Sequence, residues 1–432
     1  MSTPSITKAL AALATAATAV ALPLVGAVAP RAEVPTRALV AARHPSAPSV
    51  ARNVIYIQGD GMGIAHREFI RLALAGKTGE LKMNQLPVAG LVHTSSLDPD
   101  EAVTDSAAAA TAFATGVKSY NGAIGVDING RSVTTVLELA KKAGKATGLV
   151  TTSQVTDATP AAFASHVPDR SDQSEIARQY LERTKPDVIL GGGEDFWFPA
   201  GDPGAYPDNP PKDPAEQSKG TKGNLVARAQ ELGYDYVTTA AELKASRSKK
   251  LLGLFANEEM FEHRNEGQGG SYDPVVTLPA MAKKALDVLD DDRDGFFVMI
   301  EEEGIDEMAH HNNAHLLLKA GAALDATVAV ALDFQRRHPD TLILVTGDHE
   351  TGGLAIENVD SADESGDGES TEDGPFTIKG TDIDFYVDWT SESHTGGDTP
   401  VTAGGPGANR LGGVIENTEV FDAMVQAMRL RR

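Results

Sequence analysis

The sequence predicts an α/β fold, namely a three-layer α/β/α sandwich around a mainly parallel central sheet. Short runs rich in β-branched residues alternate along the chain with longer helical stretches, an order typical of repeated strand–helix units. The runs are apolar without alternation, which suits a sheet covered by helices on both faces. Strands are expected at residues 53–58, 90–94, 147–152, 188–190, 296–301 and 341–346.

Helices are expected between these strands, at residues 106–115, 134–143, 171–183, from 225 onward, 278–289 and 315–335. Two further segments have the composition of insertions. Residues 201–222 are dense in Pro, Asp and Gly, and residues 357–373 contain eight acidic residues with no Lys or Arg. The second insertion is expected to be a solvated loop, with weak calcium binding as the alternative.

The composition limits the function classes. With 432 residues, of which 41% are hydrophobic and 23% charged, the chain can bury a large core in one big domain or two ordinary ones. A formal net charge of −23 argues against a nucleic-acid-binding surface or an anionic membrane partner, because both repel an acidic protein. Cysteine is absent, which excludes disulfides and thiolate ligands, so any metal must be held by nitrogen and oxygen.

The N-terminus predicts export. Lys8 is followed by an apolar run over residues 9–29, interrupted by Pro23 and Gly26, as in a secretory signal. A membrane anchor is the alternative, but Pro23 and the many small residues weaken it, and no second apolar span of ~20 residues is evident. We therefore expect a signal peptide at 1–32, a flexible leader at 33–50, a single domain at 51–432, and a secreted protein without a stable membrane anchor.

Polar residues that follow strands are the first site candidates, because ligands of parallel sheets bind at the carboxyl ends of the strands. Asp60 follows the first strand, between Gly59 and Gly61, and the glycines allow a sharp turn and the close approach of a ligand. Such a loop could equally be a tight turn or a dinucleotide loop. A metal-binding Asp60 becomes the better interpretation only together with the partners below.

Ser106 lies at the predicted start of an alanine-rich helix that ends at Gly116. Free backbone N–H groups and the helix dipole stabilise an anion there, which also favours a serine nucleophile. The alternative is that Thr104, Asp105 and Ser106 only cap the helix. There is no G-x-S-x-G motif and no His evidently placed as the base of a serine triad, so a nucleophilic Ser106 would need activation by a metal.

The segment Asp157-Ala-Thr159-Pro160, followed by His166 and Arg170, combines two kinds of group. A threonine hydroxyl beside a carboxylate is typical of a hard, oxygen-ligated site such as magnesium. Arg170 offers a planar fork that suits two phosphate oxygens. A helix N-cap with proline at the first position is the simpler alternative, and both can hold.

A third acidic region follows the fifth strand. Glu301 lies at the strand end, while Asp306 and His310 are four residues apart and share one face of a helix, so they could hold one ion together. Glu307 and His311 have the same spacing but are rotated by ~100°, so only one of the two pairs should face the site. For a random pair of this spacing, a surface salt bridge is the usual outcome.

The last elements are Asp348 and His349 after the sixth strand, and His394 in a Ser-His-Thr-Gly-Gly string. Neighbouring Asp and His side chains in an extended turn can bind one ion, although such pairs are common in turns and a lone His394 would more often be structural. Five strand-end clusters together contain the ligands for three ions, and chance is a poor explanation for that.

These clusters, in this order, resemble the alkaline phosphatase family. The specific strings are VTDSAAAATAFATG, DATPAAFASHV, GDHETGG and HTGG, within a region of resemblance from about Asn53 to Met428. The resemblance implies a metal-dependent phosphomonoesterase with a phosphoserine intermediate, two zinc ions and one magnesium ion. The region 51–432 would then be an alkaline phosphatase-like catalytic domain.

The resemblance also implies a role for each matching residue. It places the first zinc on Asp306, His310 and His394, the second zinc on Asp60, Asp348 and His349, and the third ion, usually magnesium, on Asp60, Thr159 and Glu301. Ser106 would be the nucleophile, Arg170 would clamp the phosphoryl oxygens, and Asp157 would lie in the outer shell of the third ion. Glu307 is a departure, because one bacterial branch has a phosphate-contacting lysine there, which puts phosphate affinity and pH optimum in doubt.

The alternatives are a related phosphodiesterase or sulfatase, and an inactive metal-binding exported protein. The sequence contains no sulfatase C/S-x-P-x-R motif, and the diesterase branch usually has Thr in place of Ser106. An inactive protein should have lost a metal ligand or the nucleophile, and none of these residues is missing. Phosphomonoester small molecules are the expected partners, with broad specificity as the main expectation and phosphorylated aminoglycosides as the minority hypothesis. Relatives are commonly homodimers, although no interface is evident in the sequence.

Overall fold

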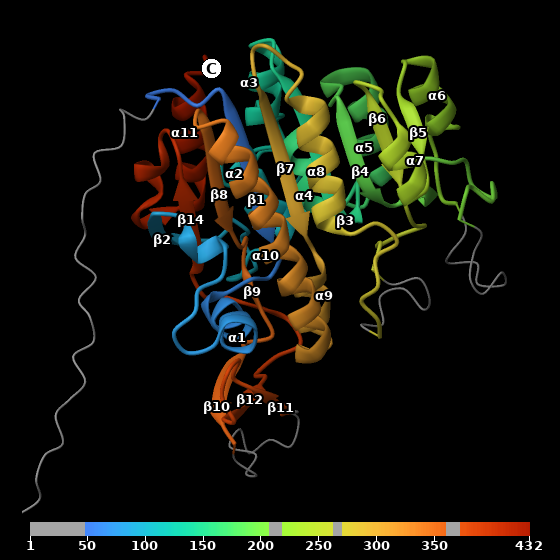
Figure 1. The fold of residues 1–432 in the computed structure, drawn as a ribbon. Coiled ribbons are helices and arrows are strands. Elements are labelled where there is room, and N and C mark those ends of the chain that lie inside the picture. Colours follow the sequence, from blue (N-terminus) through green and yellow to red (C-terminus); the bar gives the residue numbers. More distant parts are fainter. Residues whose placement is uncertain (1–47, 207–217, 262–269, 360–371) are drawn as a thin grey trace, which may run out of the picture. The chain divides into compact units, whose positions relative to one another are not determined.

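The apolar runs form a ten-stranded sheet with the order β15-β2-β14-β8-β1-β7-β3-β4-β6-β5 (Figure 1). Within it, β14 pairs antiparallel with both neighbours, and the other pairings are parallel. The strands are β1 (Asn53–Gly59), β2 (Val88–His93), β3 (Ala146–Gln154), β4 (Val188–Gly192), β5 (Asp235–Val237), β6 (Leu251–Leu254), β7 (Phe296–Glu302), β8 (Thr341–Thr346), β14 (Thr399–Gly404) and β15 (Gly413–Glu416). The mainly parallel α/β prediction is confirmed.

The computed structural model describes residues 48–206, 218–261, 270–359 and 372–432, which belong to one unit, Ser46–Arg432. The predicted signal peptide at 1–32 lies outside the described residues, as does the predicted leader at 33–50 except for its last three residues. Central parts of the two predicted insertions, residues 207–217 and 360–371, are also outside them.

Helices follow most strands, as the alternation predicted. They are α1 (Ile64–Ala75), α2 (Ser106–Thr115), α3 (Val136–Lys142), α4 (Ala158–Ala164), α5 (Gln173–Gln179), α6 (Leu225–Glu231), α7 (Ala240–Ala245), α8 (Leu278–Leu289), α9 (Gly304–His310), α10 (Ala314–Arg337) and α11 (Asn417–Met428). The predicted helix at 171–183 is divided into α5 and a π-helical turn at Tyr180–Thr184. Helix α2 has the predicted bounds because Asp105 caps its N-terminus and Gly116 ends it with a positive φ of 73°.

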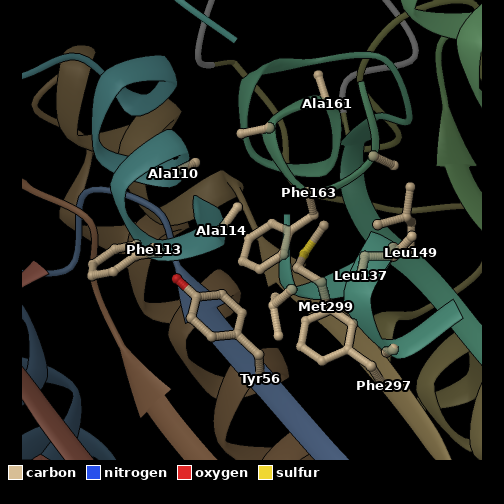
Figure 2. Close-up of a cluster of buried hydrophobic side chains, with 14 of the residues drawn as sticks. Tyr56, Ala110, Phe113, Ala114, Leu137, Leu149, Ala161, Phe163, Phe297 and Met299 are labelled. Atoms are coloured by element: carbon tan, nitrogen blue, oxygen red, sulfur yellow. The ribbon is translucent and has the colours of Figure 1, made fainter. Parts of the chain in front are cut away.

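The core lies on both faces of the sheet. Along β1, Val54 and Tyr56 belong to one buried cluster while Ile55 and Ile57 belong to another, as the two-residue period of a strand requires. Figure 2 shows the first cluster, in which Tyr56 lies with aromatic rings from α2, α4 and β7; ring centroids are 5.1 Å apart for Tyr56 and Phe163. Because both faces are covered, ligands can reach the strands only at their ends.

The expectation that no second long apolar span follows the N-terminal run was wrong for helix α10. Its 24 residues are long and apolar enough to cross a membrane by length and composition alone, whereas the sequence analysis found no second such span. In the structure α10 packs against α8, α9 and β8, and its buried face includes Leu317, Leu324 and Phe334. It therefore has the contacts of a core helix.

Two small sheets, of three and two strands, accompany the ten-stranded sheet. β10 (Ala355–Asn358), β12 (Asp384–Asp388) and β11 (Asp373–Thr377) form an antiparallel sheet in that order, which contacts α1 and α10. β9 (Glu350–Thr351) pairs antiparallel with β13 (His394–Thr395), and His394 is opposite Thr351. This short ladder brings the C-terminal histidine next to the loop that follows β8.

Candidate active site

The strand register aligns the ends that carry the candidate residues. Gln58 of β1 pairs with Glu301 of β7 on one side and with Thr346 of β8 on the other. Glu301 in turn pairs with Thr151 of β3. Since these four parallel strands are neighbours, the loops after them converge on one place, as the sequence predicted.

One cluster consists of Asp60, Asp348 and His349, whose ligand atoms all lie within 4.8 Å of one another. His349 Nε2 is 3.3 Å from Asp60 Oδ1 and 3.4 Å from Asp348 Oδ2. These two carboxylate oxygens are buried and accept no hydrogen bond. Buried charged oxygens without donors are costly, so the cluster fits a bound cation.

A second cluster is built on α9 and the β9–β13 ladder. Asp306 Oδ2 is 3.2 Å from His310 Nε2 and 3.7 Å from His394 Nε2, and the two histidine nitrogens are 3.1 Å apart. His349 also belongs here, because Asp306, His349 and His394 offer ligand atoms within 4.8 Å. The structure thus brings together the three residues expected to hold one ion, with His349 between this cluster and the first.

Gly61 shows why the loop after β1 needs a glycine. Its φ is +66°, and a Cβ at this position would lie 2.5 Å from Asp306 Oδ1. Any side chain would therefore push α9 away from the loop, so the glycine allows the two clusters to approach one another.

The third predicted group comes from the end of β7 and the start of α4. Glu301 is buried, and its Oε2 accepts a hydrogen bond from Thr151 Oγ1 at 2.6 Å. Thr159, the second residue of α4, has its hydroxyl 3.0 Å from Gln58 Nε2, which donates to it. Burial raises the pKa of Glu301, and Thr151 and Thr159 partly offset that rise. Carboxylate and hydroxyl oxygens are the ligands that magnesium prefers.

Ser106 is the first residue of α2 and is 5% exposed. Its Oγ lies 3.1 Å from His349 Nε2, a contact that the sequence did not reveal. His349 does not have the position of a general base in a serine hydrolase triad, because the same Nε2 also faces Asp60 and Asp348. Ser106 is therefore placed at the helix N-terminus and directly beside the ligand clusters.

Arg170 is held by two carboxylates. Its Nη2 donates to Asp157 Oδ1 at 2.7 Å, and its Nη1 donates to Asp105 Oδ2 at 3.4 Å. Asp105 also caps α2 through the backbone N–H of Ala108 at 2.9 Å. Its carboxylate therefore links the arginine to the helix that carries Ser106, so that an anion near the Ser106 hydroxyl would be within reach of the guanidinium.

The electrostatics of the clusters favour cations. Burial, followed by the charge of Asp348, raises the pKa of Asp60 well above its usual value, and burial also raises the pKa values of Asp348 and Glu301. Burial lowers the pKa of His349 well below its usual value, with His394 adding to the effect. His349 is thus neutral, which is the form of imidazole that binds a metal.

Several site residues were missed by the sequence analysis. Thr351 donates a hydrogen bond to Asp306 Oδ1, and Gln58 orients Thr159. Asp105, considered only as a capping residue, also binds Arg170. Thr351 is part of the GDHETGG string, so its motif could have signalled it. Glu307 and His311 form their own pair at 3.4 Å, separate from the Asp306–His310 pair.

Comparisons with known proteins agree with this geometry. The family model described as alkaline phosphatase matches residues 51–379 and 370–430. Alkaline phosphatase 4 of Bacillus subtilis is 32% identical over 435 aligned residues, covering 88% of this chain and 89% of that protein. Streptomycin-6-phosphate phosphatase of Streptomyces griseus is 33% identical, with coverage of 89% and 92%.

Solved structures give the same assignment. The alkaline phosphatase of Thermus thermophilus superposes with a TM-score of 0.72 at 27% identity, covering 90% of this chain and 93% of that one. A mutant of the enzyme from the Antarctic bacterium TAB5, with Mg bound in its M3 site, superposes with a TM-score of 0.69 at 29% identity, with coverage of 89% and 99%. The chain belongs to the alkaline phosphatase family of phosphomonoester hydrolases.

Proposed function

We propose that the chain hydrolyses phosphate monoesters through a phosphoserine on Ser106, with two zinc ions and one magnesium ion. Asp306, His310 and His394 would hold the first zinc, and Asp60, Asp348 and His349 the second. Thr159, Glu301 and Asp60 would hold magnesium. The observation that supports this most directly is the pair of buried, unpartnered oxygens of Asp60 and Asp348 around the His349 nitrogen that also faces Ser106 Oγ.

The reaction has two displacement steps at phosphorus, in which Ser106 is first the nucleophile and then the leaving group. Ser106 Oγ attacks phosphorus, the bond to the alcohol oxygen breaks, and the alcohol leaves after gaining a proton. Water then attacks the phosphoserine and releases phosphate, with Ser106 regaining its proton. Two displacements imply net retention at phosphorus. Arg170, fixed by Asp157 and Asp105, donates to the phosphoryl oxygens in both steps.

When bound, the metal ions supply the positive charge that lowers the pKa of the serine hydroxyl and neutralises the leaving oxygen. The protein contributes the positions of these groups. Thr351 orients Asp306, the carbonyl oxygen of Thr104 lies 3.1 Å from His394 Nδ1, and that of Glu392 lies 2.7 Å from His310 Nδ1. With the second ring nitrogen so engaged, each histidine directs Nε2 into the cluster.

Broad phosphomonoesters are the proposed substrates. The second candidate is a phosphorylated aminoglycoside, which is favoured by the similarity to a protein named streptomycin-6-phosphate phosphatase over most of both chains. The two are separated by comparing turnover of p-nitrophenyl phosphate and of a phosphorylated aminoglycoside at matched concentration. Equal or slower turnover of the aminoglycoside ester would reject the second candidate.

We also propose that the protein is secreted, has a single catalytic domain and forms a homodimer. The apolar run at residues 9–29 supports secretion after loss of a signal within 1–32, which would leave the catalytic domain at 51–432. Family resemblance supports a homodimer. N-terminal sequencing of the protein recovered from culture medium and light scattering of the purified protein test these proposals.

The central experiment measures p-nitrophenyl phosphate hydrolysis against pH. It compares the mature chain, Ser106→Ala, and chain stripped with EDTA before and after addition of zinc and magnesium. We expect alkaline activity that is lost with the serine and with the metals. Activity that survived in Ser106→Ala would reject the phosphoserine, and no activity in any sample would favour an inactive metal-binding protein. A diesterase would prefer bis-p-nitrophenyl phosphate.

A further inference from the structure

The short ladder between β9 and β13 carries two of the proposed zinc ligands. His349 directly precedes β9, and His394 is the first residue of β13, where it is opposite Thr351. The imidazole rings of His349 and His394 are stacked, with their centroids 3.6 Å apart. A two-stranded ladder this short is only marginally stable by itself, so other contacts must hold the two histidines together.

Glu350 supplies such contacts, because its carboxylate bridges the two strands. It is opposite Thr395 in the ladder, and its Oε2 accepts a hydrogen bond from the Thr395 hydroxyl. The same oxygen accepts from the backbone N–H of Gly353 at 3.2 Å, and Oε1 accepts from that of Leu354 at 3.1 Å. One side chain therefore holds both the residue after His394 and the turn that follows β9.

Glu350 also contacts the loop that follows β1. A Cβ at Gly63 would overlap Glu350 Cγ, so the stem of the glutamate packs directly against the backbone at the start of α1, three residues after Asp60. His66 of α1 is fully buried, and its Nδ1 is 3.5 Å from Glu350 Oε1. Glu350 thus lies where the loop after β1 meets the ladder.

Glu350 is not itself a member of a ligand cluster. Among the described residues, the groups of three whose ligand atoms lie within 4.8 Å contain His349 and His394 but not Glu350. Both of its carboxylate oxygens already accept hydrogen bonds from the protein. Any effect of Glu350 on a metal ion must therefore pass through the histidines that the ladder carries.

We propose that Glu350 is a positioning residue for zinc, acting through its hydrogen bond to Thr395. This bond fixes the separation of His349 and His394 and so determines how firmly zinc is retained. The inference rests on the proposed function. Without the bond, β13 can move away from β9 and take His394 with it. Loss of a group that holds a metal-ligating histidine in place lowers metal affinity by about 10–100-fold.

The test measures zinc release from the full mature protein. Each sample is loaded with zinc and magnesium, its metal content is determined, and release into an excess of a chromogenic zinc chelator is followed near pH 8. Thr395→Val removes the hydroxyl and keeps the branched side chain. We expect it to speed release of one zinc per chain, the one on His394, about tenfold. Glu350→Ala should speed the same release at least as much.

Two further measurements show whether the two changes act through one bond. The double variant of Glu350→Ala with Thr395→Val should release zinc no faster than Glu350→Ala alone, since residues that share one interaction are not additive. Excess zinc should restore most of the p-nitrophenyl phosphate activity that Thr395→Val loses in limiting zinc. A defect in the chemical step would not be restored in this way.

Thr390→Val is the matched control. The Thr390 hydroxyl donates to the carbonyl oxygen of Gly353 at 3.2 Å, so this change removes a threonine hydrogen bond to the same turn and leaves the ladder intact. Zinc release from this variant should equal that of the wild type. Equal acceleration in Thr390→Val and Thr395→Val would show general loosening of the region and would overturn the inference.

The remaining outcomes separate this inference from the proposed function. Unchanged zinc release in Thr395→Val overturns the positioning role, while a wild type that holds zinc and hydrolyses the ester keeps the proposed function. Additive acceleration in the double variant overturns the shared bond. A wild type that retains no zinc after loading contradicts the proposed function, and the inference about Glu350 fails with it.

Discussion

Buried carboxylates in two regions of the molecule are satisfied in different ways. Glu194, 1% exposed and at the start of a 3-10 turn after β4, accepts hydrogen bonds from the backbone N–H groups of Tyr206 at 2.6 Å and Ala205 at 3.2 Å, and from the Tyr236 hydroxyl at 3.3 Å. At the end of β1 and β8, Asp60 Oδ1 and Asp348 Oδ2 accept none.

The two regions differ in what stabilises their buried carboxylates. Burial raises the pKa values of both Glu194 and Asp348, so burial alone does not mark a functional carboxylate. Glu194 is complete within its own chain because three donors surround it. The sheet-end carboxylates are complete only when cations are bound, since their own chain offers too few donors.

The largest expected effect comes from Asp348→Asn. The amide keeps the oxygen that accepts from Gly61 and His349 N–H groups but removes the buried charge. We expect kcat/KM to fall on the order of 10³-fold or more, because zinc and the nucleophile lose their positions. In the metal-free protein the same change should stabilise the fold, by about 1–3 kcal/mol.

Asp348→Asn should therefore lower activity but raise the stability of the metal-free protein, and these opposite effects test the contrast between Asp348 and Glu194. Activity is measured on p-nitrophenyl phosphate, and stability by thermal unfolding in EDTA with the wild type alongside. A metal-free variant that was less stable than the metal-free wild type would show that Asp348 is satisfied within the chain, as Glu194 is.

Metal removal from the wild type should have the next largest effect. At free metal concentrations near 1,000 times Kd, binding stabilises the folded state by about 4 kcal/mol per site, so chelation should lower Tm by several degrees. The metal-free protein should also lose stability as pH rises, because folded-state pKa values of Asp60, Asp348 and Glu301 lie above their unfolded values. Saturating metal should remove that loss. Calorimetry at pH 6 and 9 tests both statements.

Arg170→Ala tests the guanidinium that we expect to bind the phosphoryl oxygens. We expect kcat/KM to fall about 100-fold, because the phosphoryl oxygens lose a bidentate donor and Asp157 loses its partner. Arg170→Lys should recover only part of the loss, since an ammonium cannot reproduce the planar fork. Arg178→Ala is the control, because Arg178 of α5 pairs with Glu175 of the same helix and with Glu182 of the following π-helical turn. A full recovery with lysine would reject the bidentate role.

The fold was largely predictable because its signals are local. Apolar runs without alternation identified β1, β3, β7 and β8, and Asp105 with Gly116 defined α2. The short strands β5, β6, β14 and β15 were missed, because three to six residues give too little periodicity to detect. The antiparallel direction of β14 is likewise determined by distant pairing with β2 and β8.

Site residues that lie in sequence motifs were predictable, whereas contacts between residues far apart in the sequence were not. The motif strings identified Ser106, Asp348 and His349, and the structure places His349 Nε2 3.1 Å from Ser106 Oγ and 3.4 Å from Asp348 Oδ2. Nothing in the spacing showed that Ser106 faces His349, 243 residues away.

The smallest expected effect is that of Glu194→Gln, on stability alone. Burial raises the folded-state pKa of Glu194 to about 7, above an unfolded value near 4.3. Its contribution is therefore present at low pH and is lost as pH rises through 7. The amide lacks this titration, so the stability of the variant relative to the wild type should rise between pH 5 and pH 8.5, on the order of 2 kcal/mol.

At pH 5 the variant should be the less stable of the two, because an amide nitrogen replaces one of the oxygens that accept from Ala205, Tyr206 and Tyr236. Urea unfolding of both proteins in the same EDTA buffer gives the difference at each pH and cancels the shared titration of the metal ligands. Unchanged kcat/KM in metal is the second half of the prediction, because Glu194 belongs to the region that needs no cation. A pH-independent difference would mean that the three donors hold Glu194 ionised across the whole range. The hydrogen bonds would then outweigh burial in setting its pKa, and the contrast with Asp348 would be larger.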